Sequence, residues 1–462
     1  MAPTKPTTVR TISQQAFNEM VQENIDCLDM DPTEALSDAI ETLKLQGVDL
    51  SGIVTTTLPG ETNPVIQSLD KIKHLTGSDW TNETVLHDGV CLLDSLSGLC
   101  CGNEGSENAA IGSKNGGVEL MCGVCLKMKG CDEGVVSVLN VLAAFLYDLQ
   151  STETFRQNGG PKMLVDILND GIENVKILNS GFSVVAAAAT GNEVIKESFV
   201  ELHIDELMVS IMRKHTKGSI SCLYDAIRVL LAADDNRVVA SQVYGYARQF
   251  AKNGIAEVLV KSLKDGISST SLVSATIALK AVAVNDEICR SVAENGGIDS
   301  LLICIDDCGV QGNNIVAKAC CSLLSKLAGS DFNKSAIVEK GGMNRLITLC
   351  SRLSNDPSVL QEVMTIICTL CLRSPGNATL AMEAGAGDLA IQAMKKFPEA
   401  YQLQKNSCLM VRNLVARNAE NRSLLLSNGI ERIIRNAKEN HKSCRDAATA
   451  ALRDLGLDNY NS

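Results

Sequence analysis

A glycine-centred phrase recurs through most of this 462-residue chain at a nearly constant spacing. Each copy has an apolar run, a polar step, a glycine and a second apolar run, as in VAENGGIDSLLICI (292–305) and LLSNGIERIIRNA (425–437). Successive copies are 42 to 45 residues apart, except for one interval of 95 residues that a copy without glycine, FVELHIDELMVSIM (199–212), divides in two. The first glycines of the copies are Gly116, Gly159, Gly254, Gly296, Gly341, Gly385 and Gly429.

This period determines the class of fold that we expect. Repeats of about 40–47 residues are built from two or three helices, as in armadillo and HEAT arrays. Glycine ends a helix because it tolerates the left-handed conformation, and the apolar residues of 298–305 then fall on one helical face. One repeat cannot bury that face alone, so stacking must supply the core. We therefore predict an all-α fold, a right-handed α-solenoid (superhelix) of about eight or nine armadillo/HEAT-type repeats.

The last copy makes the comparison more specific. Its phrase MVRNLVARNAENRSLLLSNGIERI (410–433) resembles the repeat of the armadillo family, ALRNLA…NENR…I…GGI..L. The N-terminal segment 12–54 resembles the head of the armadillo repeat-containing protein six subfamily, so the resemblance covers nearly the whole chain. It implies that the third helices of successive repeats line a concave groove. In the peptide-binding members, asparagines on these helices hold an extended partner backbone.

The chain divides into five segments. We expect a disordered tail (1–10), a helical extension (11–54), a linker (55–63), the solenoid (64–455, with its first repeats degenerate) and a C-terminal tail (456–462). Within the extension, Asp31 before Pro32 predicts a helix start, because a carboxylate can cap the helix and proline suits its first turn.

Composition limits the partners and the compartment. The net charge of −12 argues against a nucleic-acid partner, which would require a basic face. No stretch approaches the roughly 18 apolar residues of a membrane span, and no secretory signal opens the chain. We therefore expect a monomeric cytosolic protein that binds protein partners but neither nucleic acid nor membrane, with nuclear entry left open. Its eighteen cysteines are expected to be reduced and to pack as small apolar residues.

No pattern of a catalytic or cofactor site is present. Gly112-Ser113-Lys114 reverses the order that a phosphate-binding loop requires, and the five histidines are scattered. Six cysteines lie between 91 and 131, and Cys122 and Cys125 have the spacing of half a zinc site. A second matched pair is missing, so core packing is the preferred interpretation and a zinc-bearing module is the weaker alternative. His203 occupies a turn-glycine position, where capping or packing is its expected role.

Candidate partner-binding residues come from the resemblance. Asn413 matches the family's asparagine and follows Arg412, but the corresponding positions of other repeats hold Ser325, Thr369, Ala281 and Arg228. The asparagine ladder is thus broken, and Asn413 could instead bond a neighbouring segment.

A longer repeat near residue 244 adds a second candidate region. It contains Tyr244 and Tyr246, and insertions in repeat arrays often lie on the binding face. An extra helical turn is the alternative interpretation.

Taken together, these patterns predict a non-enzymatic scaffold or adaptor without a cofactor or metal, which docks a partner segment on the concave face. A transport adaptor that reads basic extended signals is the alternative. The acidic charge permits it, and the broken asparagine ladder disfavours it.

Overall fold

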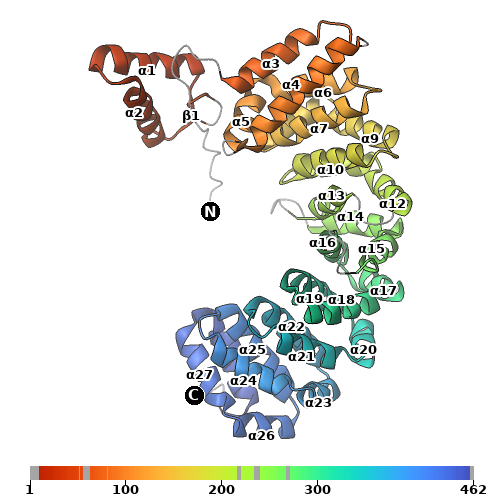
Figure 1. Cartoon of the computed structure of the whole chain (residues 1–462). Coiled ribbons are helices and arrows are strands. Elements are labelled where there is room, and N and C mark those ends of the chain that lie inside the picture. The colour runs from red at the N-terminus through yellow and green to blue at the C-terminus, as the bar shows by residue number, and fades with distance from the viewer. Residues whose placement is uncertain are drawn as a thin grey trace. The chain divides into compact units, whose positions relative to one another are not determined.

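The computed structural model describes residues 10–50, 53–55, 63–80, 82–102, 105–215, 220–233, 240–266 and 271–457. Most of the tails and the linker predicted above lies outside these ranges. The chain forms two compact units, which we describe separately (Figure 1). Unit 1 comprises residues 1–204 with 234–238, and unit 2 comprises residues 205–233 with 239–462.

Unit 1 begins with a helical hairpin that has its own small core. Helix α1 (Gln14–Leu28) packs on α2 (Pro32–Leu45), and strand β1 (Arg10–Thr11) pairs in parallel with β2 (Val48–Asp49). Asp31 caps α2 by accepting a hydrogen bond from the Thr33 amide at 3.0 Å, as the sequence predicts. The strand pair was not expected, because two residues are too few to show an alternating pattern. The buried residues of this core are Phe17, Val21, Ala35, Ala39, Leu43 and Ile53.

The rest of unit 1 is a series of helices that begins with a pair and continues in trios. We name the members of each trio the first, second and third helix, and we count α4 as a third helix. The pair is α3 (Pro64–Leu75) and α4 (Glu83–Cys101). The next elements are α5 (Gly105–Gly112), the π-helical turn η1 (Ser113–Gly117), α6 (Val118–Lys127), α7 (Asp132–Phe145), α8 (Leu149–Gln157), α9 (Gly160–Asp170), α10 (Val175–Ala189) and α11 (Glu193–Glu201).

Unit 2 continues the same order of helices. Its first part contains α12 (Ile204–Lys214), α13 (Ser221–Leu230), α14 (Ala240–Lys252), α15 (Ile255–Leu263), α16 (Leu272–Val282), α17 (Asp286–Glu294), α18 (Gly297–Gln311) and α19 (Asn314–Leu327). Its second part contains α20 (Asp331–Glu339), α21 (Gly342–Arg352), α22 (Pro357–Cys371), α23 (Pro375–Glu383), α24 (Ala386–Lys396), α25 (Tyr401–Val415), α26 (Ala419–Ser427), α27 (Ile430–Asn440), the 3₁₀ turn η2 (Lys442–Cys444) and α28 (Arg445–Asp454).

Stacking of like helices forms the core of each unit. In unit 1, third helix α7 packs between α4 and α10; in unit 2, the third helices α13, α16, α19, α22, α25 and α28 each pack on the next (Figure 1). The second helices α15, α18, α21, α24 and α27 are stacked in the same way. The all-α solenoid prediction is therefore confirmed.

The turn between first and second helices explains the repeated glycines. Gly341 has φ +73°, a conformation that residues with a Cβ rarely adopt. The following Gly342 is required for a steric reason, because a Cβ there would lie 2.6 Å from the carbonyl oxygen of Ile337. In the copy without glycine, His203 takes the same left-handed conformation, with φ +57°.

One extra helical turn accounts for part of the longer repeat. Helix α14 has 13 residues, whereas the first helices α8, α11, α17, α20, α23 and α26 have nine each. This length agrees with the extra-turn interpretation, and residues 234–239 of the same repeat lie outside the described ranges.

Helix α4 is the one helix of the described ranges that is long and apolar enough to cross a membrane. It carries Glu83, Asp88 and Asp94 and packs against α3, α5 and α7. We therefore assign it to the stacked third helices of unit 1.

Candidate functional site

Asn413, the strongest candidate from the sequence, lies half-buried on third helix α25. Its Nδ2 donates a hydrogen bond of 2.8 Å to the backbone carbonyl of Cys368 on α22, in the preceding repeat. The same nitrogen lies 3.1 Å from the Cys368 sulfur. Within the described ranges, its Oδ1 accepts no hydrogen bond. The amide nitrogen therefore joins two repeats, while the oxygen stays available to a partner.

A second asparagine of α25, not singled out from the sequence, has a similar role. Asn406 donates to the carbonyl oxygen of Gln361 at 3.2 Å and to Thr365 Oγ1 at 2.9 Å, both on α22. Its spacing of seven residues from Asn413 places both amides on one helical face, which is the signal that could have identified it.

Both candidate arginines are paired with carboxylates. Arg412 Nε lies 3.4 Å from Asp454 Oδ2, and Asp454 is also paired with Arg453 at 2.8 Å. Arg228, exposed on α13, lies 3.3 Å from Asp225 on the same helix. Their charges are thus partly neutralised within unit 2.

The positions equivalent to Asn413 can be assigned from the helix ends. Asn285 and Asn418 both cap the first helix that follows, so the equivalent residue on α16 is Lys280 and not Ala281. Lys280 Nζ donates to Ser322 Oγ on α19 at 2.6 Å. The equivalents on α19 and α22 are Ser325 and Thr369, as the sequence alignment gives.

The two tyrosines lie on a first helix, α14, and not on a third helix. The Tyr246 side chain is half-buried, and the Tyr244 side chain lies outside the described part of the chain. The structure therefore does not bring them together with Arg228 as one described site.

Charge distinguishes the third helices of unit 2 from the chain as a whole. These six helices carry eight Lys and Arg residues against four Asp and Glu residues, although the net charge of the chain is −12. Within the described ranges, five of the cations have no carboxylate partner: Lys280, Lys318, Lys326, Lys405 and Arg445. We call this surface the basic third-helix face. The negative net charge of the whole chain gave no indication of this basic face.

The third helices of unit 1 have the opposite balance, with one lysine against five carboxylates. A depression of about 910 Å³ lies over α4, α7 and the start of α10. Ser137 donates to Asp94 at 2.5 Å, and Asn174 donates to Asp132 at 2.8 Å. Asn140 is exposed there and, among the residues described, forms no hydrogen bond through its side chain. The carboxylates of the lining are Asp94, Asp132, Glu133 and Glu173.

Two of the six cysteines between 91 and 131 follow the packing interpretation, whereas Cys91 and Cys101 are exposed. Cys122 and Cys125 are buried on α6, and burial raises the pKa of the Cys122 thiol to about 12. Among the described residues, no group of three or more His, Cys, Asp and Glu side chains could hold a metal ion. Eleven of the eighteen cysteines are buried, so the packing interpretation holds for these eleven and not for the exposed Cys27, Cys91 and Cys101.

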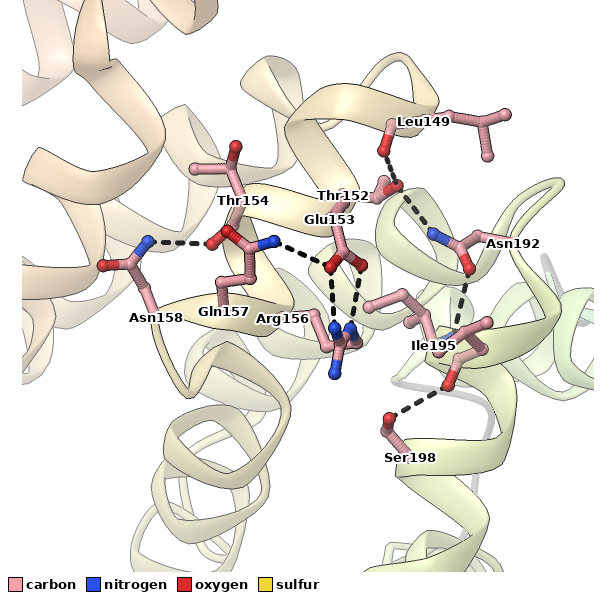
Figure 2. Close-up of polar contacts among 11 residues, drawn as sticks. Leu149, Thr152, Glu153, Thr154, Arg156, Gln157, Asn158, Asn192, Ile195 and Ser198 are labelled. Atoms are coloured by element: carbon pink, nitrogen blue, oxygen red, sulfur yellow. Dashed lines mark hydrogen bonds and ion pairs between the residues drawn. The ribbon is translucent and has the colours of Figure 1, made fainter.

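Polar contacts between first helices fix neighbouring repeats to each other. Figure 2 shows that Asn192 accepts a hydrogen bond from the Ile195 amide at 3.2 Å and donates to Thr152 Oγ1 of the preceding repeat at 2.9 Å. In the last repeat, Asn418 accepts from the Asn421 amide at 3.0 Å and donates to Thr379 Oγ1 at 3.0 Å. The capping asparagine of the repeated phrase is therefore architectural.

An ion pair also lies on α8. Arg156 donates to both carboxylate oxygens of Glu153, and these hydrogen bonds lower the pKa of Glu153 to about 2 (Figure 2).

The fold resembles solved armadillo-type structures. An engineered protein superimposes with a TM-score of 0.63 at 16% identity, over 86% of this chain and 97% of the other. A structure from a study of the interaction between cadherin and β-catenin superimposes with a TM-score of 0.61 at 15% identity, over 96% of this chain and 82% of the other. At these identities the likeness concerns the fold alone.

Sequence comparison identifies the family. Armadillo repeat-containing protein 6 of Homo sapiens is 27% identical over 392 residues, which cover 80% of this chain and 76% of that protein. The Drosophila melanogaster homolog is 24% identical over 390 residues, or 81% and 80% of the two chains. The family model ARMC6 matches residues 65–459, and the model of the armadillo repeat-containing protein 6 N-terminal domain matches residues 9–72. The chain therefore belongs to the armadillo repeat-containing protein 6 family.

Proposed function

We propose that this protein is a non-enzymatic adaptor that docks an extended segment of a partner protein on the third-helix face of unit 2. One observation carries the proposal: third helices pack in order from α13 to α28 and leave polar side chains fully or partly exposed at the equivalent positions of Lys280, Ser325, Thr369 and Asn413. The armadillo solenoid is a protein-binding fold, and the β-catenin study concerns an interaction with cadherin. Both facts support docking of a protein here.

The physical advantage of such a surface is preorganisation. Asn406 and Asn413 hold α25 on α22, and Lys280 bridges α16 to α19. These contacts fix the helices before binding. The conformational entropy lost on association is therefore mainly that of the partner segment.

A bulky side chain placed in the middle of the face tests the proposal. Ser325 is half-exposed on α19, so Ser325→Trp should block a bound segment while leaving the core intact. Ser335→Trp makes the same change at an exposed position of first helix α20 and serves as the control. Affinity capture with the full chain should lose its specific partners in Ser325→Trp and retain them in Ser335→Trp. The same partners captured by both variants would refute docking on this face.

The depression of unit 1 favours a second candidate, an adaptor that reads basic extended signals. Its carboxylates can pair with Lys or Arg side chains, and the amide of Asn140, which has no partner among the residues described, can both donate to and accept from a peptide backbone. A labelled peptide of alternating Lys and Ser should bind the full chain and be weakened by Glu133→Gln combined with Asn140→Ala. Binding that is unchanged in this double variant would exclude the depression as its site.

A further inference from the structure

We propose that the segment docked on the basic third-helix face is acidic and extended, with Lys280, Lys318, Lys405 and Arg445 as its main charge contacts. This inference rests on the proposed function and adds the chemistry of the partner.

The first step is the supply of unpaired charge. Three of the four cations are exposed: Lys280 on α16, Lys318 on α19 and Arg445 on α28. The fourth, Lys405 on α25, is half-exposed. In the described part of the chain none of the four has a carboxylate within ion-pair distance. Lys280 has only the neutral hydroxyl of Ser322 as its partner, which leaves its charge uncompensated.

The second step is the placement of the opposing carboxylates. Asp225 pairs with Arg228, and Asp454 is shared between Arg412 and Arg453. Glu362, on α22, interrupts the series of cations between α19 and α25, and the exposed Asp446 directly follows Arg445 on α28. The positive excess therefore remains on both sides of α22, and charge complementarity selects carboxylate-bearing partners and disfavours basic ones.

The third step is length. Packed helices are about 8–10 Å apart, and an extended chain rises about 3.3 Å per residue, so one repeat corresponds to about three residues of a bound segment. From α16 to α28 there are four repeat steps, which a segment of about 12 residues would span.

Asn413 also offers a hydrogen-bond acceptor to the backbone of a bound segment. The Oδ1 of Asn413 lies between the flanking cations of α25 and α28 in chain order, and it is free to accept a peptide N–H because only Nδ2 is used on α22. The side chains of an acidic segment would then supply the carboxylates and its backbone the donor.

Charge reversal on and off the face tests this inference. The variant Lys280→Glu/Lys318→Glu/Lys405→Glu reverses three charges of the face. Its control, Lys252→Glu/Lys261→Glu/Lys395→Glu, reverses three exposed lysines of first and second helices in unit 2 and changes the net charge equally. The probe is a fluorescein-labelled peptide of about 16 alternating Glu and Ser residues, which slightly exceeds the span of the face.

Fluorescence anisotropy with the full chain should show saturable binding that weakens as salt rises from about 50 to about 300 mM, because added ions screen exposed charges. The face variant should bind at least about tenfold more weakly than the wild type, and the control should stay within about twofold. Equal weakening in both variants, or no saturable binding of the Glu and Ser peptide to the wild type, would overturn the inference. Thermal unfolding followed by circular dichroism checks that both variants are folded.

Affinity capture of the natural partner distinguishes a failure of this inference from a failure of the proposed function. A partner lost in Ser325→Trp but retained by the face variant would leave docking intact and refute its acidic chemistry. A partner retained by both variants would refute both proposals. Loss in both, with retention in both controls, is the expected result.

Discussion

The third helices of the two units share one architecture and carry opposite charges. In unit 1, α4, α7 and α10 hold five carboxylates and one lysine, whereas cations outnumber carboxylates two to one on the third helices of unit 2. Packing requires only the buried face of each helix to be apolar, so exposed positions are free to diverge. The difference therefore points to binding rather than to folding.

The amides on these faces differ as well. Asn140 in unit 1 has an unengaged side chain among the described residues, whereas Asn406 and Asn413 in unit 2 hold α25 on α22. The same residue type is thus available at the surface in one unit and used for packing in the other.

The largest expected difference between the units is thiol reactivity. Exposed Cys27, Cys91 and Cys101 lie in unit 1, whereas Cys350 and Cys408 of unit 2 are buried. Burial raises the pKa of Cys408 to about 12, which lowers its thiolate fraction at pH 8. The exposed three should react with iodoacetamide at least about 100-fold faster in the native protein, because the reagent reaches them directly and burial both shields Cys408 and disfavours its thiolate.

Mass spectrometry of peptides after timed labelling measures these rates. Buried Cys122 of unit 1 provides the control within the same unit and should react as slowly as Cys408. Rapid labelling of Cys408 without denaturant would contradict the packing of unit 2.

The turns between first and second helices offer a second comparison. Gly429→Ala in unit 2 should destabilise the protein by about 1–2 kcal/mol, because alanine must adopt φ +78°. Nothing lies within 4 Å of the added methyl group, so the cost is one of backbone conformation alone.

His203→Gly makes the reverse exchange in unit 1, at a residue that already has φ +57°. It should shift the urea midpoint less than Gly429→Ala, because glycine suits this conformation. A larger loss in His203→Gly would show that the imidazole, and not the backbone, holds this turn.

The smallest expected effect is the difference in stability between alanine variants of Asn413 and Asn140. Asn413→Ala should cost about 1 kcal/mol, because the Cys368 carbonyl loses its donor. Asn140→Ala should stay within about 0.5 kcal/mol, since its exposed amide contacts no partner in the described structure. Urea unfolding followed by circular dichroism distinguishes these cases, and equal midpoints would contradict the packing role of Asn413.

Sequence patterns predicted those features that depend only on residues close together in the chain. The turn position of His203, the cap at Asp31 and the extra turn of α14 each follow from a pattern within one repeat. The sequence left open that Asn413 bonds a neighbouring segment but did not identify its partner, because Cys368 lies 45 residues earlier on another helix. Likewise, the sequence alignment placed Ala281 where the helix caps place Lys280.

By itself, then, the sequence determined the repeat, its period, its helical class and its family resemblance, because glycine turns and apolar periodicity act over a few residues. Only the tertiary structure decided which cations are already paired and which amides join α25 to α22. Stacking brings together side chains about 40 residues apart, so their contacts and the sign of each surface emerge only when neighbouring repeats are in place.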